Sequence, residues 1–217
     1  MLEELWDSAV VALGGRPGTA GDLAARYGEP HRRYHGTRHV LAVARDVVAL
    51  ADDVTERERA VLVLAALAHD VVYDGEPGHD ERASAAWAAE RLAAAGVDAA
   101  EVVRLVLATV DHEAGDRLAA LLTDADLGVL GSAPADYGWY RAAVRAEYAH
   151  VPDDAWRDGR SRVLRSLLER DPLYATAAAR DRWEVRARAN LAAELASLSD
   201  RPRARRTSGT TRRSGCR

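Results

Sequence analysis

The sequence predicts an all-α protein, and three observations lead to this fold class. Alanine, leucine, arginine and glutamate dominate the 217 residues, and all of them favour helices. Apolar residues recur three and four positions apart through most of the chain, which is the period of a helix with one buried face. Short clusters of glycine and proline separate these segments and mark the turns between helices.

Ten helices are expected in chain order. They cover residues 2–13, 19–28, 37–53, 56–72, 80–95, 98–112, 116–131, 134–149, 153–170 and 174–198. Glycine and proline define the breaks, at positions 14–18, 28–30, 74–78, 96, 115, 134, 152 and 171–172. Each break either ends one helix or begins the next, because proline and glycine are poorly tolerated inside a helix.

Three of these helices carry further signals. Thr37 can cap the third helix, and Asp80 and Glu81 place negative charge in the first turn of the fifth, where the helix dipole favours it. The fourth helix contains residues 60–68, which are apolar around the whole circumference. It is therefore expected to lie at the centre, surrounded by other helices.

The chain is expected to form one domain, residues 1–198, followed by an arginine-rich tail, residues 199–217. The tail has seven arginines and one aspartate, a net charge of +6, so the body carries −10 of the total −4. Without an apolar face the tail is expected to be disordered. The acidic body argues against specific binding of nucleic acid.

Several classes of protein are excluded by composition. Cys216 is the only cysteine, which leaves no disulfide framework and no cysteine-based zinc site. The longest apolar run, residues 60–68, is far shorter than the roughly 20 residues that span a bilayer. The first ten residues contain Glu3, Glu4 and Asp7 where a secretion signal would carry positive charge. A cytoplasmic protein without membrane contact is expected.

The fourth helix leads directly into His69 and Asp70. An unpaired carboxylate at the end of so buried a helix would cost several kcal/mol, and a metal ion or a basic partner would remove that cost. The alternative is that the helix emerges into solvent and His69 interacts with the C-terminal end of the helix dipole.

Two other polar clusters accompany this pair. Upstream, His35 and His39 lie four residues apart; downstream, Asp124 and Asp126 are set between apolar residues. Each has a simpler explanation, since Thr37 can cap a surface helix and Asp126 can start a helix in a relaxed capping box with Thr123.

In combination, the order His39, His69-Asp70, Asp126 resembles the HD superfamily of metal-dependent phosphohydrolases, in which these residue types hold a divalent metal inside an all-α domain. Over residues 1–198 the chain is similar to the bacterial group of predicted metal-dependent phosphohydrolases. The motifs that carry the similarity are PHRRYHGTRHV (30–40), AHDVVYD (68–74), DERASA (80–85), LTDADLGVLG (122–131), RAEY (145–148), GRSRVL (159–164) and ARANL (187–191). The resemblance implies an HD-domain helical bundle around a buried metal site.

The resemblance also implies a set of metal ligands, namely His39, His69, Asp70 and Asp126. Asp124 would point about 200° away from Asp126 on a helix, so it is expected to cap a helix or to support a ligand without touching the metal. Two imidazoles and two carboxylates leave about two positions of an octahedral ion open for water and a phosphate oxygen. One divalent ion is expected, with manganese first and magnesium, iron, cobalt or nickel as alternatives.

Asp74, Glu81 and His35 are the candidates for acid and base. Asp74 lies four residues after Asp70 and would share its face if the helix persisted, so it is expected to direct the attacking water. Glu81 has the alternative role at a helix start described above. His35 is expected to contact a ligand or the substrate phosphate and not to bind the metal.

Arginines near these motifs supply positive charge for a phosphate. Arg33 and Arg38 are expected to bind the substrate, whereas Arg145 is expected to form an internal ion pair with Glu147. His112 is expected to support the ligands or to extend the site toward a second metal; the alternative is an ordinary histidine at a helix end.

The predicted function is hydrolysis of a phosphoester or phosphoanhydride bond in a small phosphorylated substrate, of a nucleotide-like kind. One alternative is a nucleotide-sensing or interaction module that retains the metal site. Another is a di-iron oxygenase, which would need additional histidine ligands after the His-Asp pair, and only His79 and His112 are available. The sequence leaves the oligomeric state open.

Overall fold

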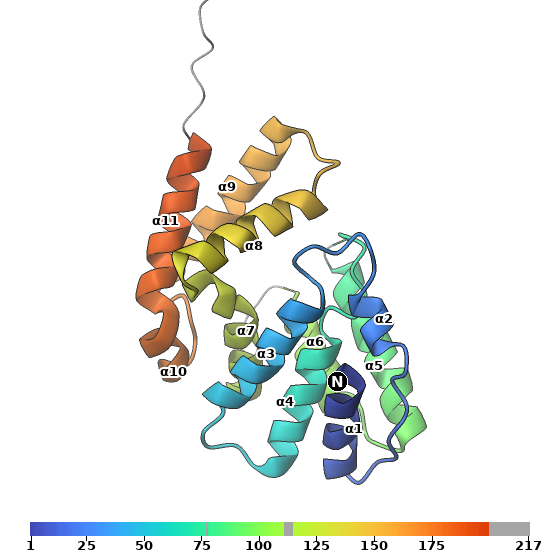
Figure 1. Ribbon diagram of the computed structural model, residues 1–217. Coiled ribbons are helices and arrows are strands. Elements are labelled where there is room, and N and C mark those ends of the chain that lie inside the picture. Colours follow the sequence, from blue (N-terminus) through green and yellow to red (C-terminus); the bar gives the residue numbers. More distant parts are fainter. Residues whose placement is uncertain (77, 111–114, 200–217) are drawn as a thin grey trace, which may run out of the picture.

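The computed structural model describes residues 1–76, 78–110 and 115–199, and within these ranges it contains helices and no strand (Figure 1). The predicted all-α class is confirmed for this part of the chain. The α-helices are α1 (Leu2–Ala12), α2 (Leu23–Tyr27), α3 (Thr37–Leu50), α4 (Glu56–Ala68), α5 (His79–Ala95), α6 (Ala100–Leu107), α7 (Arg117–Asp126), α8 (Pro134–Glu147), α9 (Asp153–Glu169), α10 (Ala177–Ala179) and α11 (Val185–Ser199). A 3₁₀ turn, η1 (Leu127–Gly131), follows α7, and a π-helical turn, η2 (Arg180–Glu184), joins α10 to α11.

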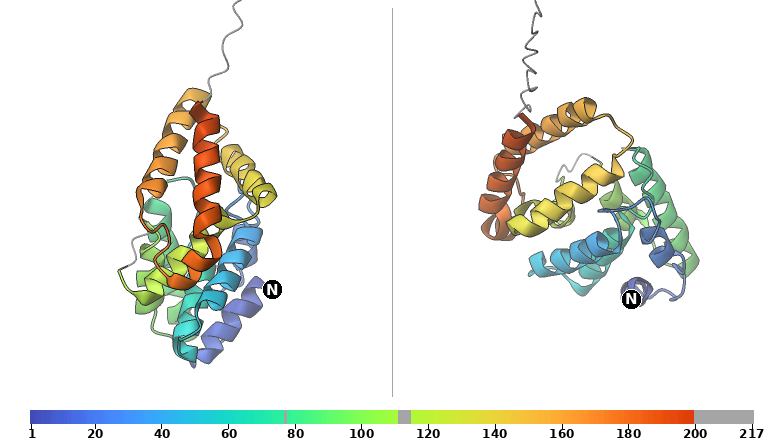
Figure 2. Two further views of the ribbon diagram at one scale, coloured as in Figure 1. Left: turned by 90° about the vertical axis from the view of Figure 1, so that its left-hand side faces the viewer. Right: turned by 45° about the horizontal axis from the view of Figure 1, so that its top comes forward.

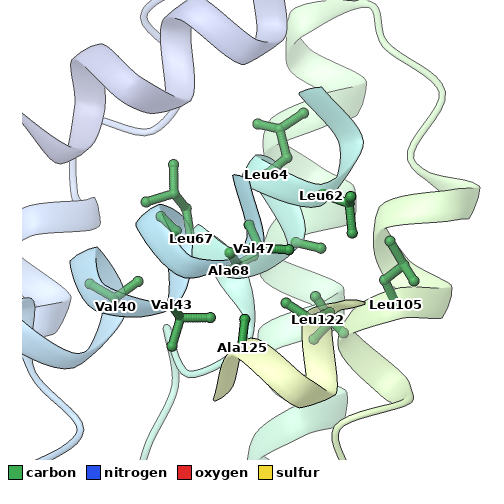
Figure 3. Packing of buried hydrophobic residues seen from close by; sticks show 14 of the residues in the cluster. Val40, Val43, Val47, Leu62, Leu64, Leu67, Ala68, Leu105, Leu122 and Ala125 are labelled. Atoms are coloured by element: carbon green, nitrogen blue, oxygen red, sulfur yellow. The ribbon is translucent and has the colours of Figure 1, made fainter. Parts of the chain in front are cut away.

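Helix α4 is the centre of the core, as predicted. It packs against α1, α3, α5, α6 and α7, and residues 60–68 are buried except for the half-buried Val63. Figure 3 shows Leu62 and Leu67 of α4 among apolar side chains of the surrounding helices, including Val43 and Leu122. Burial of so many aliphatic groups, at about 25 cal/mol per Å² of apolar surface, is the main stabilising contribution to this half of the molecule.

The predicted extent of α4, to residue 72, is wrong because α4 ends at Ala68. Arg32 donates to the carbonyls of Asp70 and Val71, and the Ser84 hydroxyl bonds both the N–H and the carbonyl of Val72. These side chains from distant parts of the chain take the backbone groups that a continued helix would use. The chain therefore leaves the helix at the His-Asp pair.

Other helix ends also differ from the predictions. Residues 19–22 and 51–53 are not helical, α6 ends at Leu107, and residues 174–198 are divided among α10, η2 and α11. Gly36 is the N-cap of α3 and Thr37 is its first residue, so the predicted cap is wrong. Thr123 donates to the carbonyls of Ala119 and Ala120, and Asp126 ends α7, which excludes the capping-box explanation of this pair.

The C-terminal helices form a second layer, which Figures 1 and 2 show as α8, α9 and α11 on one side of the earlier helices. α11 packs against α9 and η1, and α8 also packs against η1. A Cβ added at Gly131 would lie 2.4 Å from the Cβ of Trp183, so only glycine permits this close approach of η1 and η2. The buried pair of Arg160 on α9 and Glu194 on α11 joins two helices of this layer, with Nε to Oε1 at 2.9 Å.

No helix among the described residues is long and apolar enough to span a bilayer. Helix α11 extends to Ser199, and the remaining positions of the predicted arginine-rich tail, 200–217, lie outside the described residues.

Candidate metal centre

The four side chains expected to bind a metal come together at one point. His39 lies in the first turn of α3, His69 and Asp70 follow α4, and Asp126 ends α7. Each is next in sequence to a core residue, and Figure 3 shows three of these, Val40, Ala68 and Ala125, where α3, α4 and α7 pack together. The packing of these three helices thus determines where the polar groups meet.

The contacts among these groups are short. His39 Nε2 lies 3.3 Å from Asp70 Oδ2, 3.1 Å from Asp126 Oδ1 and 3.2 Å from His69 Nε2. His69 Nε2 lies 3.1 Å from Asp70 Oδ2 and 3.5 Å from Asp126 Oδ1. Two donors each about 2.1 Å from one ion, at angles of roughly 90–110°, would be about 3.0–3.4 Å apart. The spacing of His39, His69 and Asp126 therefore fits a single divalent ion, and Asp70 Oδ2 lies next to both histidines.

Burial and charge act in opposite directions on these groups. The side chains of His39 and His69 are 3% and 1% exposed. Burial by itself lowers the pKa of each imidazole, but Asp70 and Asp126 outweigh it and raise the pKa of both, that of His69 well above its usual value. In turn, His69 and His39 overcome the effect of burial and hold the pKa of Asp70 well below its usual value. The two carboxylates favour positive charge at this point.

The hydrogen bonds of His69 prepare it as a ligand. Its Nδ1 lies 2.8 Å from the carbonyl of Ala66, which can only accept, so Nδ1 carries a proton. In the neutral ring the lone pair is then on Nε2, the atom that faces His39 and the carboxylates.

The turn that carries the His-Asp pair is held by two buried polar side chains. Arg32 donates to the carbonyls of Asp70 and Val71 and to that of His35, so it links the turn to the segment before α3. Asp80 Oδ2 accepts the N–H groups of three successive residues, 74–76. Sequence reasoning selected the neighbouring Arg33 and missed Arg32, since two adjacent arginines look alike until one of them is buried.

Glu147 is the other residue whose role sequence reasoning missed. Its Oε1 accepts the N–H groups of Arg33, Tyr34 and His35, at 2.7, 2.7 and 3.0 Å, and its Oε2 accepts from His35 Nδ1 at 2.8 Å. Burial raises the pKa of this carboxyl, but the His35 ring and the backbone donors outweigh it and hold the pKa at about 2. The RAEY motif (145–148), which contains Glu147, was the sequence feature that could have indicated this role.

The predicted internal ion pair of Arg145 with Glu147 is wrong. Arg145 instead donates to Asp153 and to the carbonyls of Tyr148 and Val151. Its guanidinium therefore holds the turn between α8 and α9, while the carboxylate of Glu147 faces the segment before α3.

The structure separates the two acidic candidates for catalysis. Asp74 is exposed and follows the end of α4, so it does not continue a helical face from Asp70. Glu81, in the first turn of α5, lines a hollow together with His69 and Asp70, and its Oε2 accepts the Gly78 N–H at 2.6 Å. Glu81 therefore both caps the start of α5 and lies beside the candidate metal centre.

The remaining predicted residues lie as follows. Asp124 is buried and its two oxygens accept the N–H groups of Ala175 and Thr176, so it anchors the start of α10 and faces away from the ligands. Arg38 lines a hollow beside His39, whereas Arg33 is exposed and lines none of the hollows described below. His112 lies outside the described residues.

Three hollows meet at the metal centre, and Asp126 lines all of them. The acidic hollow, of about 160 Å³, is lined by His35, His69, Asp70, Tyr73, Asp80, Glu81 and other residues. The arginine-lined hollow, of about 640 Å³, includes Arg38, His39, Arg45, Arg182 and Arg186. The aromatic hollow, of about 740 Å³, includes Tyr34, His35, Tyr140, Tyr148, Trp156 and Arg160.

Comparison with known protein families agrees with this geometry. Residues 36–143 match the model of the HD domain, a range that contains all four side chains of the metal centre. No curated protein and no solved structure gives a match. HD domains form a superfamily of the metal-dependent phosphohydrolase type. The chain belongs to the HD-domain superfamily.

Proposed function

We propose that this protein is a metal-dependent phosphohydrolase that cleaves a phosphoester or phosphoanhydride bond in a small, nucleotide-like metabolite. The observation that supports this most directly is the position of Asp126, which is grouped with His39 and His69 and also lines all three hollows. A phosphoryl group held at this point has on one side a hollow lined by four arginines and three aspartates, and on another a largely apolar hollow. Such surroundings suit a substrate with a phosphate end and an organic end.

Manganese is the proposed ion, because two imidazole nitrogens and two carboxylate oxygens form a mixed donor set that suits manganese, iron, cobalt or magnesium. When bound, such an ion would lower the pKa of a water molecule and polarise the phosphoryl group.

Glu81 is proposed to orient the attacking water. Its carboxylate lines the acidic hollow with His69 and Asp70, and the Gly78 N–H fixes one of its two oxygens. The second oxygen has no hydrogen-bond partner among the described residues, so it is available to accept from a water molecule. Asp74 has no comparable position, because it does not line this hollow.

His35 is proposed to deliver a proton to the leaving oxygen. Its Nδ1–H donates to Glu147 at 2.8 Å, and this hydrogen bond fixes the orientation of the ring. His35 lines both the acidic and the aromatic hollows, so its ring stands between the water side and the leaving-group side. In the imidazolium form the proton on Nε2 can pass to the departing oxygen.

Positive charge for the phosphate comes from the arginine-lined hollow. Arg38 lies over the Trp139 ring at 4.2 Å and pairs with Asp136 at 2.9 Å, which keeps its guanidinium beside His39. Arg186 also lines this hollow, and its Nε donates to the carbonyl of Gly131. These planar groups suit bidentate contact with phosphate oxygens.

The test is a screen of the purified full chain with added divalent metals over nucleotides and phosphorylated metabolites. Phosphate release together with one labile divalent ion per chain, measured by elemental analysis, is the expected result. Two irons with an oxygen-sensitive spectrum would replace the proposal with an oxygenase, and tight ligand binding without turnover would replace it with a nucleotide sensor.

A further inference from the structure

We propose that the aromatic hollow is the subsite for the leaving part of the substrate, that this part is a flat ring bearing a neutral carbonyl-type acceptor, and that Arg160 recognises the acceptor. This proposal rests on the function proposed above, since it presumes a phosphoryl group at the metal centre. It adds the chemical class of the organic portion and a residue that determines specificity.

The aromatic hollow is continuous with the metal centre. Tyr34, His35 and Asp126 line the hollow, and the Tyr34 ring lies 4.6 Å from the ring of His39. A group bonded to a phosphoryl at the centre therefore enters the hollow directly past His35. Its volume, about 740 Å³, is within the range of small-molecule sites and exceeds what a phosphate alone would fill.

The walls of the hollow suit a planar ring. Tyr34, Tyr140, Tyr148 and Trp156 contribute aromatic faces, and the rings of Tyr148 and Trp156 lie 5.4 Å apart at 36°. Both of these rings are only partly buried. Aromatic faces of this kind stack on flat rings with preference over flexible chains, because a rigid ring loses little conformational entropy on binding.

Arg160 provides a polar contact in these surroundings. Its Nε and Nη2 donate to the two oxygens of Glu194, and Nη2 also donates to the Tyr140 hydroxyl. Nη1 has no hydrogen-bond partner among the described residues, and it is not fully buried. Because Arg160 lines the hollow, this atom is the one available to a ligand there.

The pairing of Arg160 sets the kind of acceptor that it prefers. Glu194 is 4% exposed and pairs with Arg160 at 2.9 Å and with Arg141 at 3.6 Å. The guanidinium of Arg160 therefore already has a carboxylate partner, and a neutral acceptor is enough for Nη1. Arg162 also lines the hollow but is exposed, so its charge is screened by solvent. A ring carbonyl would satisfy Nη1, whereas a purely hydrocarbon group would leave it unpaired.

Gly159 allows the hollow to be filled without disturbing the core. It lies on α9, lines the hollow, and a Cβ added there meets no atom within 4 Å. Gly138 on α8 is the matched control, since it also has free space around its Cα but does not line the hollow. Replacing a helical glycine with leucine raises helix propensity, so Gly159→Leu and Gly138→Leu should both unfold at or above the temperature of the parent.

Binding is measured by calorimetry on the manganese-loaded full chain, with phosphonates that cannot be hydrolysed. The parent and Gly138→Leu should bind phenylphosphonate about tenfold more tightly than methylphosphonate. Gly159→Leu should bind methylphosphonate normally and lose the tenfold preference. A parent without preference for the phenyl compound, or a preference that survives in Gly159→Leu, overturns the subsite.

A second pair of probes tests Arg160. The parent should bind 4-acetylphenylphosphonate more tightly than 4-isopropylphenylphosphonate, which has a similar shape and no acceptor; equal affinity would overturn the role of Arg160. Failure of the proposed function can be distinguished from failure of the subsite. If only the proposed function is wrong, the protein leaves phenyl phosphate intact, but the parent still prefers phenylphosphonate and Gly159→Leu still lacks this preference.

Discussion

Replacement of Glu147 by glutamine should destabilise the protein at neutral pH and have progressively less effect as the pH falls. The carboxylate is 3% exposed and accepts from three backbone N–H groups, from His35 Nδ1 and, at 3.3 Å, from the Tyr73 hydroxyl. Glutamine has nearly the same shape, so the change removes the negative charge and leaves the packing in place. The variant therefore isolates the electrostatic contribution of this residue.

The magnitude follows from the pKa of Glu147, which is about 2 in the folded protein against 4.5 for an ordinary glutamate. This difference corresponds to about 3 kcal/mol in the free energy of unfolding. Because the pKa is lowered on folding, the stabilisation is fully present above about pH 4.5 and is lost as the pH falls toward 2. Parent and variant should thus differ most near neutral pH and converge in acid.

Urea unfolding of both proteins, followed by circular dichroism at several values between about pH 7 and pH 3, measures this difference. Titration of all other carboxyl groups cancels when the two free energies are subtracted. Glu90→Gln, at an exposed glutamate of α5, is the control and should change stability little at any pH. A Glu147→Gln difference that is small at neutral pH, or that stays constant with pH, would show that the carboxylate charge does not stabilise the fold.

The other predictions concern the metal centre, catalysis and the tail. His69→Ala and Asp70→Ala should lose the bound metal and all hydrolysis but keep their helical content; stoichiometric metal by elemental analysis in either variant would contradict the assignment. Glu81→Gln should keep metal and substrate affinity and lose about 10² to 10⁴ in kcat. Asp74→Asn should stay close to the parent in the same assay, and the reverse pattern would exchange the two roles. Deletion of residues 200–217, which have no apolar face, should shift Tm by less than about 5 °C; a larger fall in calorimetry would show that the tail packs on the body.

Features that depend on local sequence pattern could be predicted without a structure. Helical periodicity predicts the all-α class, and the unbroken apolar run of residues 60–68 predicts the central helix. The resemblance to HD domains singled out His39, the His-Asp pair at 69–70 and Asp126, and these residues lie close together because each is attached to a core segment of a helix. Where hydrophobic burial dictates how helices pack, polar residues at their ends are placed with them.

The residues that surround the four expected ligands depend on how the helices pack, and local pattern does not predict them. The end of α4 depends on Arg32 and Ser84, which take its backbone hydrogen bonds from 12 or more residues away in the chain. That early end removes Asp74 from the face of Asp70 and leaves the position beside the metal centre to Glu81. The partners of Glu147 could not be predicted from the sequence either. A carboxylate pairs with whichever donors lie within hydrogen-bonding distance, and helix packing, not sequence spacing, determines which donors these are.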